Sequence, residues 1–292
     1  MVIIHKYNKD HAWQYDIRLN TLEEDKEELS LSDEDLSKLR VADFEFRAGN
    51  KADFQDIKEF IIKYEWLGTL PPYPTHYFIA TYKGVLAGVL IYTMPNAFSK
   101  LLGDQTKDLE RLLARGACAS WTPKNLASAF ISWSVNWMVD NTQYRVFTAY
   151  SDPMARELGT VYQACNWNYL GQTSGSTYRY KEPGSSKWVS DRKFRNLASY
   201  KKYAGEMGVD WDPSWSTKRK VHWENMPEGL EERLRDEGKR RQAECERMKV
   251  PPKHKYAMIK GRDKRETKQL LQIFKQLNPK LVDLAYPKER GV

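Results

Sequence analysis

Apolar residues recur along the middle of the chain at two spacings, which together predict an ordered series of strands and helices. Residues 44–68 predict a short alternating strand and then a helix, because apolar residues repeat at helical spacing in the second part. Residues 77–95 predict a β-hairpin that turns at Lys83-Gly84. Residues 107–120 fit either a helix or a strand by periodicity. The helical stripe of the first segment consists of Ile57, Phe60, Ile61 and Tyr64.

The series continues with a second helix, a strand, a third helix and a closing hairpin. The Thr-Pro dipeptide at 122–123 predicts the start of the second helix, with threonine as cap and proline in the first turn. The next strand ends at Asp152, which also begins the short helix that carries Tyr162. Residues 168–181 predict the closing hairpin, with Gly175 in its turn. The stripe of the second helix is Leu126, Phe130, Trp133 and Trp137.

Composition divides the chain into three parts. Residues 1–42 form an extension with an acidic helical patch, which we expect to be solvated and to which we assign no function. Residues 43–182 contain the ordered series of strands and helices. After a linker-like Pro-Gly-Ser-Ser break, residues 183–292 are basic and mainly helical. Within that part, residues 228–249 carry charge on nearly every helical face and predict either a solvated helix or an interaction arm.

Positive charge is concentrated in the last third of the chain. The formal net charge is +8, but residues 181–292 hold 28 Lys and Arg against 17 Asp and Glu, so the other 180 residues are net −3. A clustered positive field attracts phosphates, which favours a polyanionic partner. A highly charged soluble tail explains the same composition.

Cysteine use and hydropathy indicate the compartment. Cys118, Cys165 and Cys245 are odd in number and lack a CxxC pair, which argues against a disulfide framework and against a zinc site. No run of about 18 apolar residues predicts a transmembrane helix. The first residues contain an apolar run too short for a signal-peptide core. We therefore expect a cytoplasmic protein with no membrane partner and no bound metal.

The order of elements over roughly residues 44–181 resembles the GNAT superfamily of acyl-CoA transferases. YKGVLAGVLIY is similar to the early hairpin of that superfamily. GTVYQACNWNYLG is similar to its last helix, in which a tyrosine protonates the leaving thiolate. The resemblance implies an α/β fold with a GNAT-like mixed central sheet and flanking helices, followed by the basic, mainly helical C-terminal extension. It aligns Tyr162 with that tyrosine and Asn166-Trp167 with the usual Gly-Phe pair.

The same resemblance implies a donor site. In that superfamily, the loop and helix start after the central strand hold the CoA pyrophosphate, because a helix N-terminus exposes unpaired N–H groups. The corresponding stretch here, ASWTPKNLASA, has no glycine where the superfamily pattern has two positions for one. The implied donor is acetyl-CoA or another acyl-CoA. The implied donor-binding residues are Ser120, Trp121, Lys124, Asn125 and Ser128.

The chain more closely resembles Mom-like phage DNA-modification proteins, a divergent branch of the same fold. The matching segments are LERLLARGACASWTPKNLASAFISW, YSDP, GTVYQACNWNYLG and the Tyr-Pro-Lys motif at 286–288. This resemblance implies modification of double-stranded DNA in a bacterial host cell. It implies the catalytic candidates Tyr162, Asp152, His76 and Glu110, with Arg111 beside them as a nucleic-acid contact.

The basic tail supplies further candidates for nucleic-acid binding. Aromatic and basic residues interleave in WVSDRKFRN and SYKKYAG, so phosphates would meet the cations and unstacked bases would meet the rings. A charged helical wrap on the catalytic domain explains the same segments. The candidates are Lys187, Arg192, Lys193, Arg195, Lys201 and Lys202.

Several candidates also have a purely structural interpretation. Asp152 precedes a proline and suits a helix cap, and Tyr162 lies on an apolar stripe. His76 fits an exposed loop, and Trp121 fits a core position. Glu110 and Arg111 fit a surface pair, and the serines and Lys124 at the helix start fit capping and solubility.

These observations predict a DNA base-modifying acyltransferase that acts on an amino group of adenine or of an already modified base. Such an enzyme must flip the base out of the duplex or act on a protruding substituent. Two alternatives remain open. One is a conventional N-acetyltransferase for a protein or small amine, and the other is a DNA-binding module on an inactive GNAT scaffold. The sequence does not indicate an oligomeric state.

Overall fold

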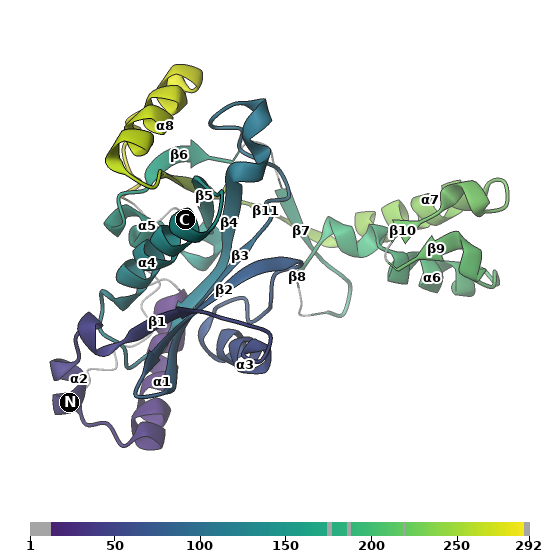
Figure 1. Cartoon of the computed structure of the whole chain (residues 1–292). Coiled ribbons are helices and arrows are strands. Elements are labelled where there is room, and N and C mark those ends of the chain that lie inside the picture. The colour runs from purple at the N-terminus through teal and green to yellow at the C-terminus, as the bar shows by residue number, and fades with distance from the viewer. Residues whose placement is uncertain (1–12, 174–176, 186–187, 219, 289–292) are drawn as a thin grey trace. The chain divides into compact units, whose positions relative to one another are not determined.

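The computed structural model describes residues 13–173, 177–185, 188–218 and 220–288 of the chain (Figure 1). These residues are divided between two compact units. The first unit joins the chain up to residue 173 with the chain from residue 253 onward, and the second unit is residues 174–252.

A seven-stranded mixed sheet organises the first unit, in the order β1-β2-β3-β4-β5-β12-β6. β4 and β5 run parallel, whereas every other neighbouring pair in this sheet is antiparallel. This confirms the predicted mixed central sheet. The strands are β1 (Glu45–Ala48), β2 (Pro74–Tyr82), β3 (Val85–Thr93), β4 (Glu110–Cys118), β5 (Val146–Ser151), β6 (Asn168–Gln172) and β12 (His254–Ile259).

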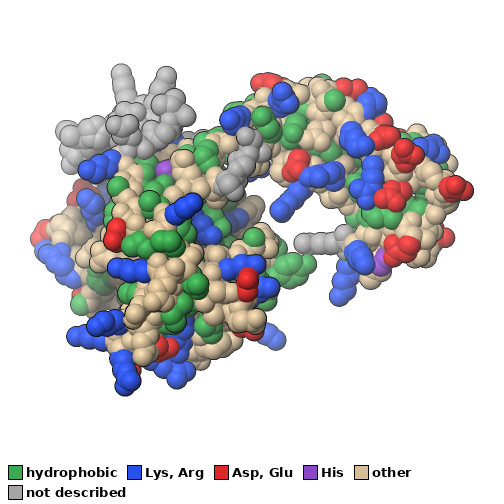
Figure 2. Space-filling model, turned by 90° about the horizontal axis from the view of Figure 1, so that it is seen from above, with side chains coloured by type: hydrophobic (Ala, Val, Ile, Leu, Met, Phe, Trp, Pro, Cys, Tyr) green, Lys and Arg blue, Asp and Glu red, His purple; other side chains and the backbone are tan. Residues whose placement is uncertain are grey.

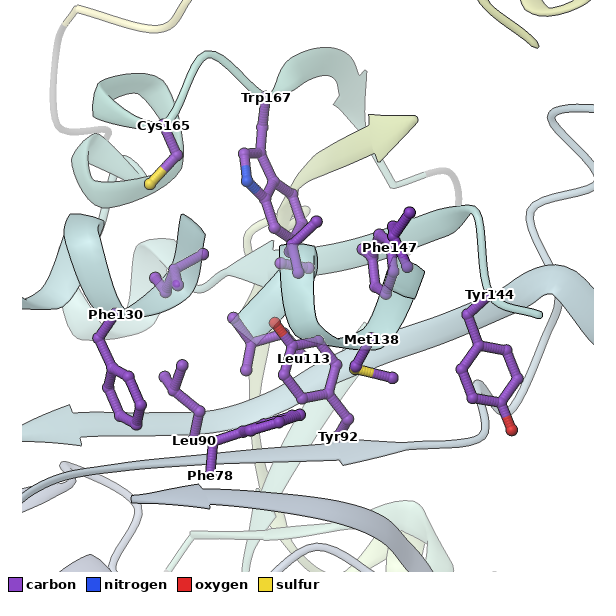
Figure 3. Close-up of a cluster of buried hydrophobic side chains, with 14 of the residues drawn as sticks. Phe78, Leu90, Tyr92, Leu113, Phe130, Met138, Tyr144, Phe147, Cys165 and Trp167 are labelled. Carbon is purple, nitrogen blue, oxygen red and sulfur yellow. The ribbon is translucent and has the colours of Figure 1, made fainter. Parts of the chain in front are cut away.

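Helices cover both faces of this sheet. α4 (Leu126–Asn141) packs on the face that carries Phe78, Leu90 and Tyr92, and Figure 3 shows this cluster. α3 (Phe54–Tyr64) packs with Ile79, Val89 and Ile91. Since successive strand residues point to opposite faces, α3 and α4 lie on opposite sides of the sheet. The other helices of this unit are α1 (Trp13–Leu29), α2 (Asp33–Lys38), α5 (Thr160–Ala164) and α8 (Lys264–Leu277).

The start of α4 differs from the prediction. The helix begins at Leu126 with Asn125 at its cap position, not at the Thr-Pro dipeptide. Thr122 instead donates its hydroxyl to the carbonyl of Ala119 at 2.8 Å, and the N–H of Leu126 bonds to the carbonyl of Pro123 at 3.0 Å. The dipeptide therefore forms a turn before the helix. The ambiguous segment before it is a 3₁₀ turn followed by β4.

Most acidic side chains of the N-terminal segment are exposed, as the sequence predicts, but one of them is buried and fixes α1 in place. Asp25 of α1 is only 1% exposed. Its carboxylate accepts the hydroxyl of Tyr64 at 2.7 Å and that of Ser120, and it lies 2.9 Å from the ammonium of Lys63. These contacts dock α1 against α3 and against the loop before α4. Because a lone charge in a polar segment gives no sign of its partners, the sequence did not reveal this docking.

The predicted hairpin at 168–181 is wrong. β6 pairs with β12, and β7 (Thr177–Lys181) pairs with β8 (Trp188–Ser190) and β11 (Glu246–Val250) in a separate sheet. Gly175, expected in the turn, lies outside the described residues. The second unit is thus an insertion between β6 and β12. The domain boundary expected at residues 182–183 therefore lies elsewhere, because β12 and α8 return to the first unit.

The second unit has its own small core. α6 (Leu197–Glu206) and α7 (Leu230–Ala243) bury Tyr200, Tyr203 and Leu234 with Trp215. The charged segment at residues 228–249, predicted as one helix, is helical only as far as Ala243 and continues as β11. A short pair, β9 (Ser216–Thr217) and β10 (Lys220–Val221), completes this unit. The 3₁₀ turns of the chain are Val41–Asp43, Asp104–Leu109, Pro153–Ala155, Asp191–Arg195, Pro213–Trp215, Trp223–Asn225 and Pro279–Leu281.

Candidate active site

The parallel strands β4 and β5 part halfway along β4. They pair from Glu110–Val146 to Leu113–Ala149, whereas β4 runs on to Cys118. Against β3, Ile91 pairs with Arg115 and Tyr92 pairs with Leu113, so Ala114 is the extra residue of a β-bulge in β4. Bulges are frequent beside active sites because they redirect a strand.

Tyr162 packs on Tyr256, the β12 residue that pairs with Ala149 at the last paired position of β5 with β4. Its ring packs on Trp167 at 5.2 Å and on Tyr256 at 5.4 Å between centroids, within the core cluster of the α4 face. Among the described residues, no group forms a hydrogen bond with its hydroxyl. Burial raises the pKa of this phenol, and the nearby Glu157 raises it further. Asn166 adopts a positive φ of 56°, which asparagine tolerates, so it can stand where the superfamily has glycine.

Asp152 acts as a cap, as its structural interpretation predicts, but it caps a separate 3₁₀ turn and not the helix that carries Tyr162, which begins at Thr160. One carboxylate oxygen accepts the N–H of Met154 at 3.0 Å, at the start of a 3₁₀ turn. The other lies 2.7 Å from the ammonium of Lys253. Both oxygens therefore have partners within the first unit.

Glu157 and Glu65 form an acidic pair at the same end of the sheet. Burial raises the pKa of Glu157 to about 7, and the carboxylates of Glu65 and Asp152 raise it further. Burial also raises the pKa of Glu65, whose carboxylate lies 3.8 Å from the guanidinium of Arg115. Sequence reasoning missed both glutamates. A single glutamate in a loop or at a helix end has no diagnostic spacing.

Glu110 is buried at the paired end of β4 and is 2% exposed. Its carboxylate accepts the N–H and the hydroxyl of Ser99, each at 2.7 Å, and the hydroxyl of Thr148 at 3.1 Å. This residue is therefore not part of a surface pair. Three donors hold its position and join β4, β5 and the loop that follows β3.

Arg111 and His76 meet around Tyr144. The guanidinium of Arg111 lies over the Tyr144 ring at 3.8 Å and donates to its hydroxyl. The His76 ring meets the same ring edge-on at 5.6 Å, and burial followed by the charge of Arg111 lowers the pKa of His76. The structure thus brings together two residues that the sequence only suggested. Arg111 is buried, so its charge faces Tyr144 instead of solvent.

A polar strip lies on the sheet face shared with α3 and α8. Thr148 and Tyr150 alternate with the α4-side residues of β5, and Lys255 points to the same side because its ammonium lies 5.8 Å from the Tyr150 ring. Burial lowers the pKa of Lys255. Tyr150 and Lys255 remain partly exposed. Sequence reasoning missed Lys255 because β12 was not predicted.

The predicted donor residues divide into two groups. Ser120 donates its hydroxyl to Asp25, and Trp121 packs against Phe44 at 5.9 Å with only 3% of its surface exposed. Both therefore face the interior. Lys124 and Asn125 are exposed just before α4.

The first turn of α4 leaves donors free near these two exposed residues. In the described part of the chain, the N–H groups of Ala127 and Ser128 have no acceptor, as is usual for a helix start. The Ser128 hydroxyl donates to the carbonyl of Asn125 at 3.0 Å. An anionic group would therefore find N–H donors and the Lys124 ammonium together here.

The basic candidates of the second unit differ in their partners. Lys193, Arg195 and Lys202 each form an ion pair within their own unit, with Glu182, Asp191 and Glu206. Arg192 and Lys201 form none with the described residues. Lys187 lies outside the described residues.

A pocket of about 940 Å³ lies over the start of α6. Its lining contains no acidic residue. Lys218 and Arg235 contribute to it and were not among the sequence candidates. The basic and aromatic lining residues are Arg192, Arg195, Lys201, Lys218, Arg235, Tyr200 and Trp223.

The described residues have neither a metal-ligand cluster nor a membrane-spanning helix. They contain no group of three or more His, Cys, Asp or Glu side chains arranged to hold a metal ion. None of their helices combines the length and the apolar character that a membrane crossing needs.

The sheet order and the divergence of β4 and β5 define a mixed α/β protein with a GNAT-like central sheet and flanking helices. The chain belongs to the Mom protein family, because the model of that family matches residues 50–280. No curated protein matches the sequence.

Solved acetyltransferase structures show a distant likeness. The ribosomal-protein-S5-alanine acetyltransferase from Vibrio fischeri is 13% identical, with 45% of this chain and 82% of that chain covered and a TM-score of 0.34. A putative acetyltransferase from Salmonella typhimurium, solved with its cofactor acetyl-CoA, is 11% identical, with coverage of 50% and 86% and a TM-score of 0.33. A Bacillus subtilis acetyltransferase in complex with CoA is 6% identical, with coverage of 74% and 99% and a TM-score of 0.33.

Proposed function

We propose that the protein is an acyltransferase that moves an acyl group from an acyl-CoA-type donor to an amino group on a base of double-stranded DNA. The base is adenine or an already modified base. Membership of the Mom family supports this proposal. The observation that carries it is the position of Tyr162, which packs on the cluster containing Leu113 and Ala149, the last paired residues of β4 and β5.

The start of α4 suits the donor. An acyl-CoA-type donor supplies an activated thioester carbonyl when it is bound. Lys124, Asn125 and the free N–H groups of the first turn would hold its pyrophosphate, since a helix N-terminus favours anions. Ser120 and Trp121 would only shape the loop, because their side chains are engaged in the core.

Two side chains at the divergence suit the proton transfers. The Tyr162 phenol is protonated at neutral pH, and its hydroxyl, which has no partner among the described residues, would give its proton to the departing sulfur. Glu157 has a pKa of about 7 and lies within electrostatic range of Tyr162. A carboxylate with such a pKa is suited to take the proton of the attacking amine. Asp152 would support Glu157 as a neighbour and would not itself transfer a proton.

The polar strip suits the acceptor. Tyr150 and Lys255 are its partly exposed members, and they would contact the amino group or the ring of an extruded base. The Glu110 carboxylate already accepts three hydrogen bonds, so its role would be to position the Thr148 hydroxyl within the polar strip. In the second unit, the pocket with Arg192 and Trp223 would hold phosphate and a stacked base.

The decisive experiment is nucleoside mass spectrometry of DNA from cells that express the protein. We expect a nucleoside with an added acyl-derived mass for the wild type and its loss for the Tyr162→Phe variant. Unmodified DNA together with acylation of a protein or small amine would establish a conventional N-acetyltransferase. Absence of acyl-CoA binding by calorimetry would leave a DNA-binding module on an inactive scaffold.

The donor site has a separate test. Lys124→Glu places an anion beside the proposed pyrophosphate position and should weaken binding of acetyl-CoA or CoA. Lys58→Glu, on the exposed side of α3, is the matched control. Equal affinity of all three proteins would exclude the start of α4 as the donor site.

A further inference from the structure

A basic groove runs along α8 in the first unit. It encloses about 950 Å³, and five of its lining residues are cations: Lys260, Arg262, Lys264, Lys268 and Lys275. Three of these cations follow one side of the helix, at the first, fifth and twelfth positions of α8. At 1.5 Å per residue, the outer two are about 16 Å apart along the axis.

The groove has one acidic lining residue against five cations. Asp263 is its one acidic lining residue, and its carboxylate already caps α8 by accepting the N–H of Glu266 at 2.7 Å. Glu266 in turn binds Arg145 at 2.6 Å. Within the described part of the chain, Lys264, Lys268 and Lys275 form no ion pair. Like charges four residues apart destabilise a helix, so an anionic partner would relieve the strain between Lys264 and Lys268.

The net positive charge of the sequence is also concentrated in the segment that contains α8. Residues 253–292 hold 11 Lys and Arg against 4 Asp and Glu, whereas residues 174–252 hold 18 against 13. The shorter segment therefore carries the larger surplus. Figure 2 looks down on the side of the molecule where α8 lies in Figure 1, and it shows basic side chains spread over that face of the first unit with few acidic ones among them.

We infer that the α8 groove is a second DNA contact, which binds the phosphate backbone of the duplex whose base is modified. A row of cations along a helix suits a polyanion whose phosphates repeat along its length. It suits a single phosphate less well, because it does not surround one. α8 packs through Phe274 on Ala257 and Ile259, the residues that follow Lys255 on the same side of β12. The groove therefore borders the face that carries the proposed acceptor strip. This inference rests on the proposed function for its choice of DNA.

The test measures salt-dependent binding of a duplex of arbitrary sequence to the full-length chain, by fluorescence anisotropy. The α8 pair is Lys268→Ala/Lys275→Ala, and the control pair is Lys51→Ala/Lys58→Ala, two exposed lysines of the same unit. Each phosphate contact contributes about 0.9 to the slope of log affinity against log salt. We expect the α8 pair to reduce the slope by about 2, with weaker binding to every sequence and an unchanged melting temperature. The control pair should keep both values of the wild type.

Three results would overturn the inference. A slope and affinity unchanged in the α8 pair, with binding lost in Arg192→Ala/Lys201→Ala, would confine the DNA contact to the second unit and leave the proposed function intact. An α8 pair that no longer binds vesicles of anionic phospholipid, but binds DNA as the wild type does, would make the groove a membrane contact. A wild type that does not bind duplex DNA would remove both the DNA partner of the proposed function and this groove contact. Groove-dependent DNA binding without acyl transfer would support the inference and refute the transferase proposal.

Discussion

The ring of Tyr162 packs on the ring of Trp167 at 5.2 Å, and among the described residues no hydrogen-bond partner contacts the Tyr162 hydroxyl. The ring therefore contributes to the core, whereas the hydroxyl contributes nothing that the core needs. Tyr256, in the same aromatic cluster, shows the opposite arrangement, because its hydroxyl donates to the carbonyl of Leu158.

We expect Tyr162→Phe to keep its melting temperature and to lose activity. Removing a hydroxyl without a partner leaves no buried group unsatisfied, but removing a positioned proton donor costs about 10²–10⁴ in turnover. Tyr256→Phe is the matched control. It should lose about 1–3 kcal/mol of stability and keep its turnover per folded molecule. A fully active and destabilised Tyr162→Phe would make Tyr162 a core residue and end its proposed role.

Glu157 should make stability depend on pH. Its folded pKa of about 7 is higher than that of an unfolded glutamate, so the folded state binds the proton more tightly. Its contribution is then complete below about pH 4.5 and is lost as the pH rises to about 7. At about 1.4 kcal/mol per pKa unit, the loss is of the order of 3 kcal/mol.

Glu157→Gln tests this dependence directly, because glutamine keeps the shape and cannot ionise. We expect the variant to be more stable than the wild type at pH 8, similar to it at pH 4.5, and poor in acyl transfer at both. Urea unfolding at the two pH values measures the difference. Parallel pH profiles for the two proteins would show that Glu157 ionises normally.

The sequence predicted the order of elements from β1 to β6, except for β4, which it left open between helix and strand, because each of the others has a local pattern. β2 and β3 flank a Lys-Gly turn, and α4 carries an apolar stripe, so their recognition does not require distant partners. β12 was missed because its partners β5 and β6 precede it by a whole inserted unit. No periodicity within a six-residue strand indicates such a pairing.

The difference between local and long-range signals also explains which residues of the candidate site were predicted. Asp152 and Tyr162 were predicted because a proline or a motif accompanies each of them. Glu65, Glu157 and Lys255 owe their shifted pKa values to burial, and burial arises only when separate segments pack together. Motifs thus indicated some residues of the candidate site. The residues whose pKa values are shifted by burial could be recognised only in the folded structure.

Trp121 separates a core role from a donor-binding role. Its ring packs against Phe44 and Tyr82, at 5.9 and 5.8 Å, so Trp121→Ala should cost about 3–5 kcal/mol of stability. Calorimetry at a temperature where the variant is folded should give the donor affinity of the wild type. A loss of donor affinity with little loss of stability would restore Trp121 as a donor-binding residue.

The last prediction concerns the docking of α1. Asp25 is buried between Tyr64, Ser120 and Lys63, so Asp25→Ala would leave two hydroxyls without their acceptor and would remove the shortest ion pair of Lys63. Breaking a buried pair by removing one partner costs about 3–5 kcal/mol. Limited proteolysis should then cut within residues 13–29 much faster than in the wild type. Glu24→Ala is the matched control, because its exposed carboxylate lies 3.7 Å from the same lysine and such surface pairs contribute about 0–1 kcal/mol. Equal proteolysis rates for the two variants would show that α1 is held by its apolar contacts alone.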